Sequence, residues 1–211
     1  MDDCNFNDCV NLTEFDNART LSFHPPDGEF VVLNYRMTSE FRAPFRLFPN
    51  IEETSPTIIE ISCHVRAEIP ENHFGANVTI EIPLPRSTAA ASSSVVSSPG
   101  AVGVRAEYVS QDRKILWQFK KFPGGSEQTL RSKVTLSSPS TSQTRKEIGP
   151  ISMNFEIPMY NVSSLQVRYL RIAEAIPGYT PYRWVRSVFT LKRTYLLKSY
   201  FLTNLNSLLF E

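Results

Sequence analysis

Residues 59–69 read Ile-Glu-Ile-Ser-Cys-His-Val-Arg-Ala-Glu-Ile, an unbroken alternation of apolar and polar side chains. Successive side chains of an extended strand point to opposite faces, so one face of this segment is apolar and the other carries Glu60, His64 and Arg66. The alternation predicts a half-buried antiparallel strand, and the same pattern recurs along most of the chain.

Five further segments show this period of two, at 30–37, 77–84, 115–122, 130–136 and 151–157. Prolines close several of them, as expected where a strand stops donating hydrogen bonds to its neighbours; these are Pro83, Pro85, Pro123 and Pro158. Many short strands separated by turn signals, with 15 prolines in 211 residues, predict an all-β fold made of one antiparallel β-sandwich or two.

Four segments depart from the strand pattern. The Ser- and Ala-rich composition of 87–103 predicts a flexible surface loop, and the Ser- and Thr-rich segment 137–147 predicts a second one. Gly124-Gly125 follows a proline and predicts a β-hairpin turn. In 189–211 apolar residues recur at spacings of three, four and seven, which predicts an amphipathic C-terminal helix.

Composition and charge exclude some classes of function. Lys and Arg number 22 against 21 for Asp and Glu, so no basic excess favours nucleic-acid binding. The first residues carry acids rather than the cations of a signal peptide, and no apolar run has the length of a membrane span, which predicts a cytoplasmic protein. Cys4, Cys9 and Cys63 lack metal-ligand spacing and are expected as free thiols.

Motifs of catalysis and cofactor binding are not found in the sequence. His24, His64 and His73 have no metal-binding spacing, and neither a nucleophile elbow nor a phosphate-binding loop is present. Paired acids such as Glu52-Glu53 lie in expected turns without a basic partner nearby in sequence. We therefore predict no catalytic residues, no metal, no cofactor and no enzymatic activity.

Two runs interleave cations with apolar residues. The first is Leu165-Gln166-Val167-Arg168-Tyr169-Leu170-Arg171-Ile172, and the second is Tyr182-Arg183-Trp184-Val185-Arg186. As strands, they would place a tryptophan and an arginine side by side next to an aliphatic slot, and these residue types are common in binding hot spots. The alternative is that Trp184 is a core ring and the arginines form a solvated edge; composition alone slightly favours this alternative.

Several motifs follow one another in a fixed order, at 2–6, 15–19, 25–30, 34–36, 44–46, 149–158, 165–170 and 183–186. Together they resemble the mu homology domain, the cargo-binding half of the medium (mu) chains of adaptor protein complexes. The resemblance runs from Met1 to about Arg186, with greatest similarity to medium chains of the fourth adaptor complex of plants.

The resemblance implies two β-sandwich subdomains, one inserted in the other. It assigns 42–159 to the inserted subdomain, 1–41 with 160–186 to a partial signal-binding subdomain, and 187–211 to a divergent tail. In the family an earlier strand supplies the acid that accepts the signal's tyrosine hydroxyl, and an amino-terminal longin-like domain joins the large chain. Neither has a counterpart in these residues, so the tyrosine pocket is expected to be half built.

Members of the family bind Tyr-x-x-Φ sorting signals, where Φ is a bulky apolar residue, as an added strand. Carried over residue by residue, Trp184 and Arg186 would flank the signal's tyrosine ring. The apolar pocket for Φ would be formed by Val167, Leu170, Val185 and the stem of Arg183.

The resemblance also implies a second peptide surface, which in fourth-complex medium chains takes Tyr-x-(Phe/Tyr/Leu)-(Phe/Leu)-Glu signals. It would include Phe6 and Asn34, and the alternative for Phe6 is an edge-strand ring packed in the core. A phosphoinositide site known elsewhere in the family is not carried over, because 102–108 holds one Arg and one Glu instead of a lysine cluster.

The implied partners are cytosolic tails of transmembrane cargo and, in the full complex, the large and small adaptor subunits. The implied location is cytoplasmic and peripheral, at trans-Golgi network, endosome or coated-vesicle membranes. The alternative function is a truncated β-sandwich scaffold without signal binding. Peptide titration distinguishes the two.

Overall fold

We describe a computed structural model of the chain over residues 3–36, 42–163, 165–173, 188–196, 199–200 and 206–210, with only the backbone in the last three ranges. The chain divides into two compact units. Unit 1 comprises Met1–Glu40 and Thr203–Glu211, and unit 2 comprises Phe41–Leu202. Unit 2 therefore lies, in sequence, between the two parts of unit 1.

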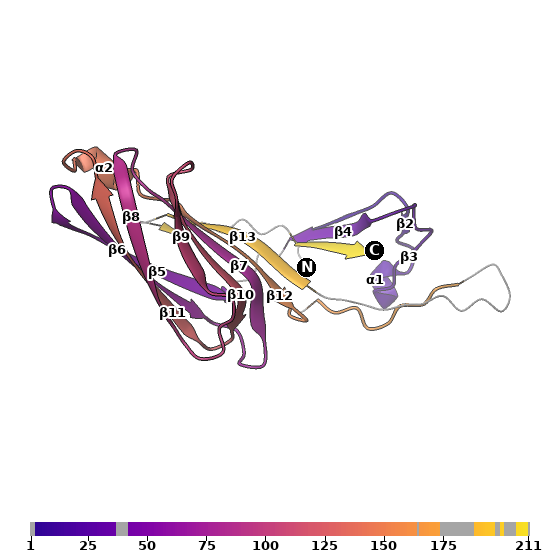
Figure 1. The fold of residues 1–211 in the computed structure, drawn as a ribbon. Helices are drawn as coiled ribbons and strands as arrows, with labels where there is room; N and C mark the ends of the chain where they lie inside the picture. The colour runs from indigo at the N-terminus through magenta and orange to yellow at the C-terminus, as the bar shows by residue number, and fades with distance from the viewer. Residues whose placement is uncertain are drawn as a thin grey trace. The chain divides into compact units, whose positions relative to one another are not determined.

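Unit 2 is a sandwich of two antiparallel sheets (Figure 1). The smaller has the order β5-β6-β11-β8, with bounds Phe45–Ser55, Ile58–Ala67, Glu127–Leu136 and Thr88–Ser97. The larger has the order β14-β13-β12-β7-β10-β9, with bounds Ser199–Tyr200, Val188–Leu196, Ile151–Pro158, Phe74–Pro83, Lys114–Pro123 and Arg105–Val109. The predicted all-β antiparallel fold is confirmed.

The alternation in 59–69 has the predicted consequence. Ile59, Cys63 and Val65 are fully buried, whereas Glu60 and Arg66 are exposed. These apolar side chains meet an aromatic cluster between the sheets, in which the rings of Phe45, Phe122, Phe155, Trp117 and Phe119 pack mostly edge to face or tilted. Each such burial stabilises the fold by about 1.5–3 kcal/mol relative to exposure, so this core holds the two sheets together.

The loop expected at 87–103 is wrong, because most of it is strand β8. Residues 88–97 pair antiparallel with β11, and the hydroxyls of Ser93 and Ser132 lie 2.6 Å apart across the two strands. Small serine and alanine side chains give a weak strand signal in sequence, but the ladder with β11 supplies the backbone hydrogen bonds that hold them extended. In 137–147 the chain instead forms α2 (Ser142–Lys146), begun by a capping box of Thr141 and Thr144.

Gly124-Gly125 forms a turn, but the predicted hairpin is wrong. β10 belongs to the larger sheet and β11 to the smaller one, so the turn carries the chain across the sandwich instead of pairing its two strands. Gly124 donates its backbone N–H to the carbonyl of His73 at 2.9 Å, and a Cβ on it would lie 2.0 Å from the carbonyl oxygen of Pro70. Only glycine fits this close approach.

The amphipathic helix expected in 189–211 is also wrong for the part that the structure describes. β13 pairs with β12 along eight positions, from Ile151 opposite Tyr195 to Pro158 opposite Val188. β15 (Asn206–Phe210) instead pairs with β4 (Phe30–Arg36) in unit 1. An exposed strand edge offers a complete row of backbone partners, and here that outweighs the helical spacing of a few leucines.

Unit 1 contains a three-stranded antiparallel sheet of order β1-β4-β15, where β1 spans Asp3–Phe6. It also holds the short strands β2 (Val10–Asn11) and β3 (Ser22–Phe23) and the single turn α1 (Phe15–Ala18). Val32, Leu33 and Tyr35 of the central strand β4 are buried.

Candidate functional site

The chain leaves β12 through a defined turn. Met159 has a positive φ of 54°, and the Asn161 side chain then accepts hydrogen bonds from the Ser163 backbone N–H at 2.9 Å and its hydroxyl at 2.6 Å. The Asn161 amide in turn donates to the carbonyl of Leu165 at 2.8 Å. The turn is thus fixed by one asparagine, and it sets the direction of the residues that follow.

Aromatic and apolar packing ties the start of this segment to unit 2. Tyr160 contacts His73 edge to face at 5.4 Å between ring centroids, and both Tyr160 and Val162 pack against the core. Leu165, Val167 and Leu170 are half-buried but lie outside that core cluster. Their apolar surface is therefore only partly used by the fold.

Residues 165–172, which the sequence predicts as a strand, belong to no strand in the structure. The exposure of the side chains alternates only from Leu165 to Arg168, because Tyr169, expected on the inner face, is 69% exposed. Alternation alone does not make a strand, because a strand also requires a neighbour to pair with its backbone.

The predicted Tyr-x-x-Φ residues are thus described only in part. Val167 and Leu170 lie three residues apart, each half-buried, in the segment just described. The other four predicted residues, Arg183, Trp184, Val185 and Arg186, lie outside the described residues.

The second predicted surface has a clear local geometry. Phe6 on β1 stands opposite Leu33 on β4, while Asn34 stands opposite Asn5. Directly opposed residues share a face and neighbours along a strand alternate, so the side chains of Phe6 and Asn34 project from opposite faces of the sheet. Phe6 is half-buried and meets Phe15 edge to face at 4.9 Å. The structure does not bring Phe6 and Asn34 together on one surface.

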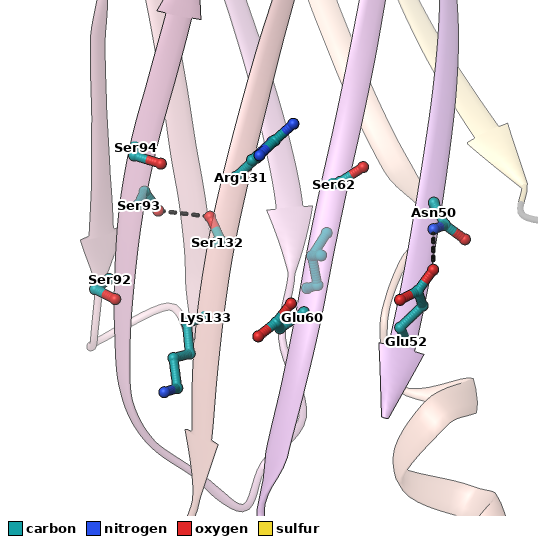
Figure 2. Close-up of a pocket in the computed structure, with 11 residues that line it drawn as sticks. Asn50, Glu52, Glu60, Ser62, Ser92, Ser93, Ser94, Arg131, Ser132 and Lys133 are labelled. Atoms are coloured by element: carbon teal, nitrogen blue, oxygen red, sulfur yellow. Dashed lines mark hydrogen bonds between the residues drawn. The ribbon is translucent and has the colours of Figure 1, made fainter. Parts of the chain in front are cut away.

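Sequence reasoning missed a groove on the outer face of the four-stranded sheet (Figure 2). It is open and has a volume of about 630 Å³. Ser92 and Ser94 of β8, Lys133 and Arg131 of β11 and Glu60 of β6 line it from neighbouring strands. The sequence signal is the pair of cations, Arg131 and Lys133, at polar positions of 130–136, but the composition of the serine-rich strand beside them predicts a loop.

One cluster of charges lies at the end of the same sheet. The Glu68 side chain is 6% exposed and is surrounded by the guanidinium groups of Arg42, Arg46 and Arg66, with Arg66 Nε 3.3 Å from its carboxylate. Burial alone would raise the pKa of Glu68, but the hydrogen bond from Arg42 and the charges of the three arginines outweigh it, so the pKa is lowered. The cluster is a structural ion network.

A similar contact lies beside it. His64 Nε2 is 3.3 Å from the Glu127 carboxylate and its Nδ1 is 3.0 Å from the Thr129 hydroxyl. Across the described residues there is no group of three or more His, Cys, Asp or Glu side chains arranged to hold a metal ion. No helix in the described part of the chain has the length and apolar character needed to span a membrane.

The chain was compared with known proteins. Residues 1–197 match the model of the adaptor complexes medium subunit family. The chain is 48% identical over 188 residues to the AP-4 complex subunit mu of Arabidopsis thaliana, which covers 89% of this chain and 41% of that protein. It is 38% identical over 187 residues to the AP-2 complex subunit mu of Dictyostelium discoideum, covering 88% of this chain and 41% of that protein.

Among solved structures, the mu-homology domain of yeast delta-COP-I matches with a TM-score of 0.48 at 12% identity, covering 72% of this chain and 59% of that chain. The chain spans about two fifths of the length of the curated relatives it matches. Members of the matched family are adaptor subunits and not enzymes. On the match over residues 1–197, the chain belongs to the adaptor complexes medium subunit family.

Proposed function

We propose that this chain is a cargo-recognition module of an adaptor medium chain in vesicle-mediated protein transport. It would bind tyrosine-based sorting signals of the Tyr-x-x-Φ type as an added β-strand. Family membership over residues 1–197 and the 48% identity to an AP-4 mu subunit support the general role.

The proposal of Tyr-x-x-Φ binding rests on the partial burial of apolar side chains in residues 165–170. Val167 and Leu170 are half-buried, outside the core cluster of unit 2 and outside every strand, so they retain apolar surface that a ligand can cover. The Asn161 turn and the packing of Tyr160 fix the start of the segment. A fixed apolar patch is suited to receive one bulky aliphatic side chain.

In this proposal Val167, Leu170, Val185 and the stem of Arg183 form the pocket for Φ, and Trp184 and Arg186 flank the tyrosine ring. A phosphate on the signal's tyrosine would abolish docking, because the added bulk and charge do not fit beside an aromatic ring. For so short a peptide we expect a dissociation constant in the micromolar range, which corresponds to a binding free energy of about −8 kcal/mol. Several such contacts at a membrane would raise the effective affinity.

The proposed partners are cytosolic tails of transmembrane cargo, together with the large and small subunits of an adaptor complex. The proposed location is cytoplasmic and peripheral, at trans-Golgi network, endosome or coated-vesicle membranes. The proposed assignment of 1–41 with 160–186 to the signal-binding subdomain follows from the family resemblance.

Fluorescence anisotropy with a labelled Tyr-x-x-Leu peptide tests the proposal. Val167→Asp places a charge in the apolar pocket and should weaken binding by about tenfold or more. Gln166→Asp introduces the same residue at the neighbouring exposed position and should change affinity by less than about twofold. Trp184→Ala should also weaken binding. No saturable binding by the parent chain would favour the scaffold alternative.

A second site at Phe6 is proposed as the alternative surface for tyrosine signals. It is favoured by the half-buried ring of Phe6, which stays partly accessible beside its edge-to-face contact with Phe15. Selective loss of binding in Phe6→Ala, with Val167→Asp unaffected, would assign the activity to this surface.

A further inference from the structure

Strand β8 (Thr88–Ser97) is an edge strand without the usual protection. It is the last strand of the four-stranded sheet, ten residues long, and contains neither a charged residue nor a proline. Proteins usually protect such edges with lysine, proline or short length, because an edge presents unpaired backbone groups to other chains. β8 therefore retains the capacity to pair with a further strand.

Strands β8 and β9, the edge strands of the two sheets, contact each other on this side of the sandwich. Ala91, Ser93 and Val95 point toward the core, yet they are only half-buried, whereas Val134, Ser132 and Leu130, which stand opposite them on β11, are buried. On the other sheet, Ala106 and Tyr108 of the edge strand β9 are half-buried as well. Part of the apolar surface of these half-buried side chains is left accessible, and a neighbouring strand with apolar residues on its inner face would cover it.

The outer face beside the edge is basic and sterically open. In the strand register Ser92 stands opposite Lys133 and Ser94 opposite Arg131, and both serines are exposed (Figure 2). Among the described residues, neither Lys133 nor Arg131 has a carboxylate within ion-pair distance. Because serine is short, it does not shield these two cations from a strand that lies beyond β8.

We propose that the β8 edge binds an extended segment of a partner protein in which apolar residues alternate with acidic ones. The segment adds as a fifth strand, its apolar residues cover the accessible part of Ala91 and Val95, and its acidic residues approach Lys133 and Arg131 above the serines. The added strand lies two strand spacings, about 10 Å, from β11, a gap that long basic and acidic side chains bridge together.

Charge favours this occupant over a second copy of the chain. β8 carries no acid of its own, so pairing two β8 edges would bring two sets of Lys133 and Arg131 closer together, with Glu60 opposite Lys133 as the adjacent counter-charge in each set. Glu60 and Glu52 on the far side of the groove disfavour a polyanion such as nucleic acid, which would extend over them. A short segment paired with β8 can place its acidic side chains near Lys133 and Arg131 without extending over Glu60 and Glu52.

The test uses the whole 211-residue chain and a labelled peptide of about ten residues that alternates valine with glutamate. Saturable anisotropy is expected, and it should fall severalfold between about 50 and about 500 mM NaCl. A peptide of the same composition in blocks, and one with lysine in place of glutamate, should both bind about tenfold more weakly or not at all. Equal binding of the block peptide would overturn the proposal.

The charge reversals Arg131→Glu and Lys133→Glu, combined, should weaken the alternating peptide by about tenfold or more. The matched control combines Arg86→Glu with Lys146→Glu, which changes net charge equally at exposed positions away from the groove and should leave affinity within about twofold. Circular dichroism and thermal unfolding check that both variants fold. Unchanged affinity in the first variant would overturn the proposal, as would dimerisation through β8 in sedimentation experiments.

Discussion

Phe6 and Asn34 project from opposite faces of one sheet, because Phe6 stands opposite Leu33 and Asn34 stands opposite Asn5. A peptide lying on either face therefore meets one of these side chains and not the other. The family resemblance implies one surface for both residues, but we expect substitutions at Phe6 and at Asn34 to affect peptide binding differently.

This separation predicts unequal effects on a Tyr-x-Phe-Leu-Glu peptide. Phe6→Ala should weaken binding by about tenfold, whereas Asn34→Ala should change it by less than about twofold. Because Phe6 also packs on Phe15, Phe15→Ala serves as the control for lost ring packing. Anisotropy titrations give the affinities. Equal losses in Phe6→Ala and Phe15→Ala would assign Phe6 a packing role only.

The Glu68 network predicts a loss of stability in acid. The pKa of Glu68 is lowered in the folded chain, so its ionised form is favoured by folding at pH values above the unfolded value of 4.5. That contribution is lost as the pH falls below 4.5 and through the lower folded pKa. Thermal unfolding across this range should show a falling Tm, with a shallower fall in Glu68→Gln. If Tm falls with pH identically in the two proteins, the Glu68 network is not the cause of the loss of stability in acid.

Adding a single methyl group at Gly124 should greatly lower the free energy of unfolding of unit 2. Gly124→Ala places a Cβ 2.0 Å from the Pro70 carbonyl oxygen, which forces the backbone apart and should destabilise unit 2 by about 3 kcal/mol or more. Gly125→Ala is the control in the same turn. Its φ of 68° and a contact of 3.1 Å to the flexible Glu71 side chain should cost about 1–2 kcal/mol. Urea unfolding measures both, and equal losses would contradict the steric explanation.

Cys63 should be inert in the folded chain. Burial raises its pKa to about 12, which leaves almost no thiolate at neutral pH, and its sulfur lies in the core. Cys4 and Cys9 are half-buried and should react first with a thiol reagent. Mass spectrometry of the native chain after brief alkylation should show Cys63 unmodified until denaturant is added. Early modification of Cys63 would mean that the sandwich opens far more readily than its packing indicates.

The strands that could be predicted from the sequence are those whose apolar residues face a buried core. The alternation at 59–69 and at 151–157 corresponds to β6 and β12, because burial on one face imposes the period of two directly. β8 was missed, since its serines and alanines have little preference of their own and the strand exists through its partner β11.

Segments defined by long-range pairing were the least predictable. In 188–196 helical spacing and strand propensity coexist, and the free edge of β12 determines the outcome. In 165–172 the sequence alternates, but the structure gives no strand. The candidate residues Val167 and Leu170 could be named only through the family resemblance, because no periodicity distinguishes a pocket wall from an ordinary strand face.

The central claim is that Val167 and Leu170 hold the apolar residue of a tyrosine signal, and a double-mutant cycle tests it most directly. Changing the signal's leucine to alanine should weaken binding to the parent chain by roughly tenfold. If Leu170 contacts that leucine, the same peptide change should weaken binding to the Leu170→Ala variant only about twofold. The difference between the two losses is a coupling energy of about 1 kcal/mol. Equal losses in the two proteins would contradict the claim, because the leucine would then bind elsewhere.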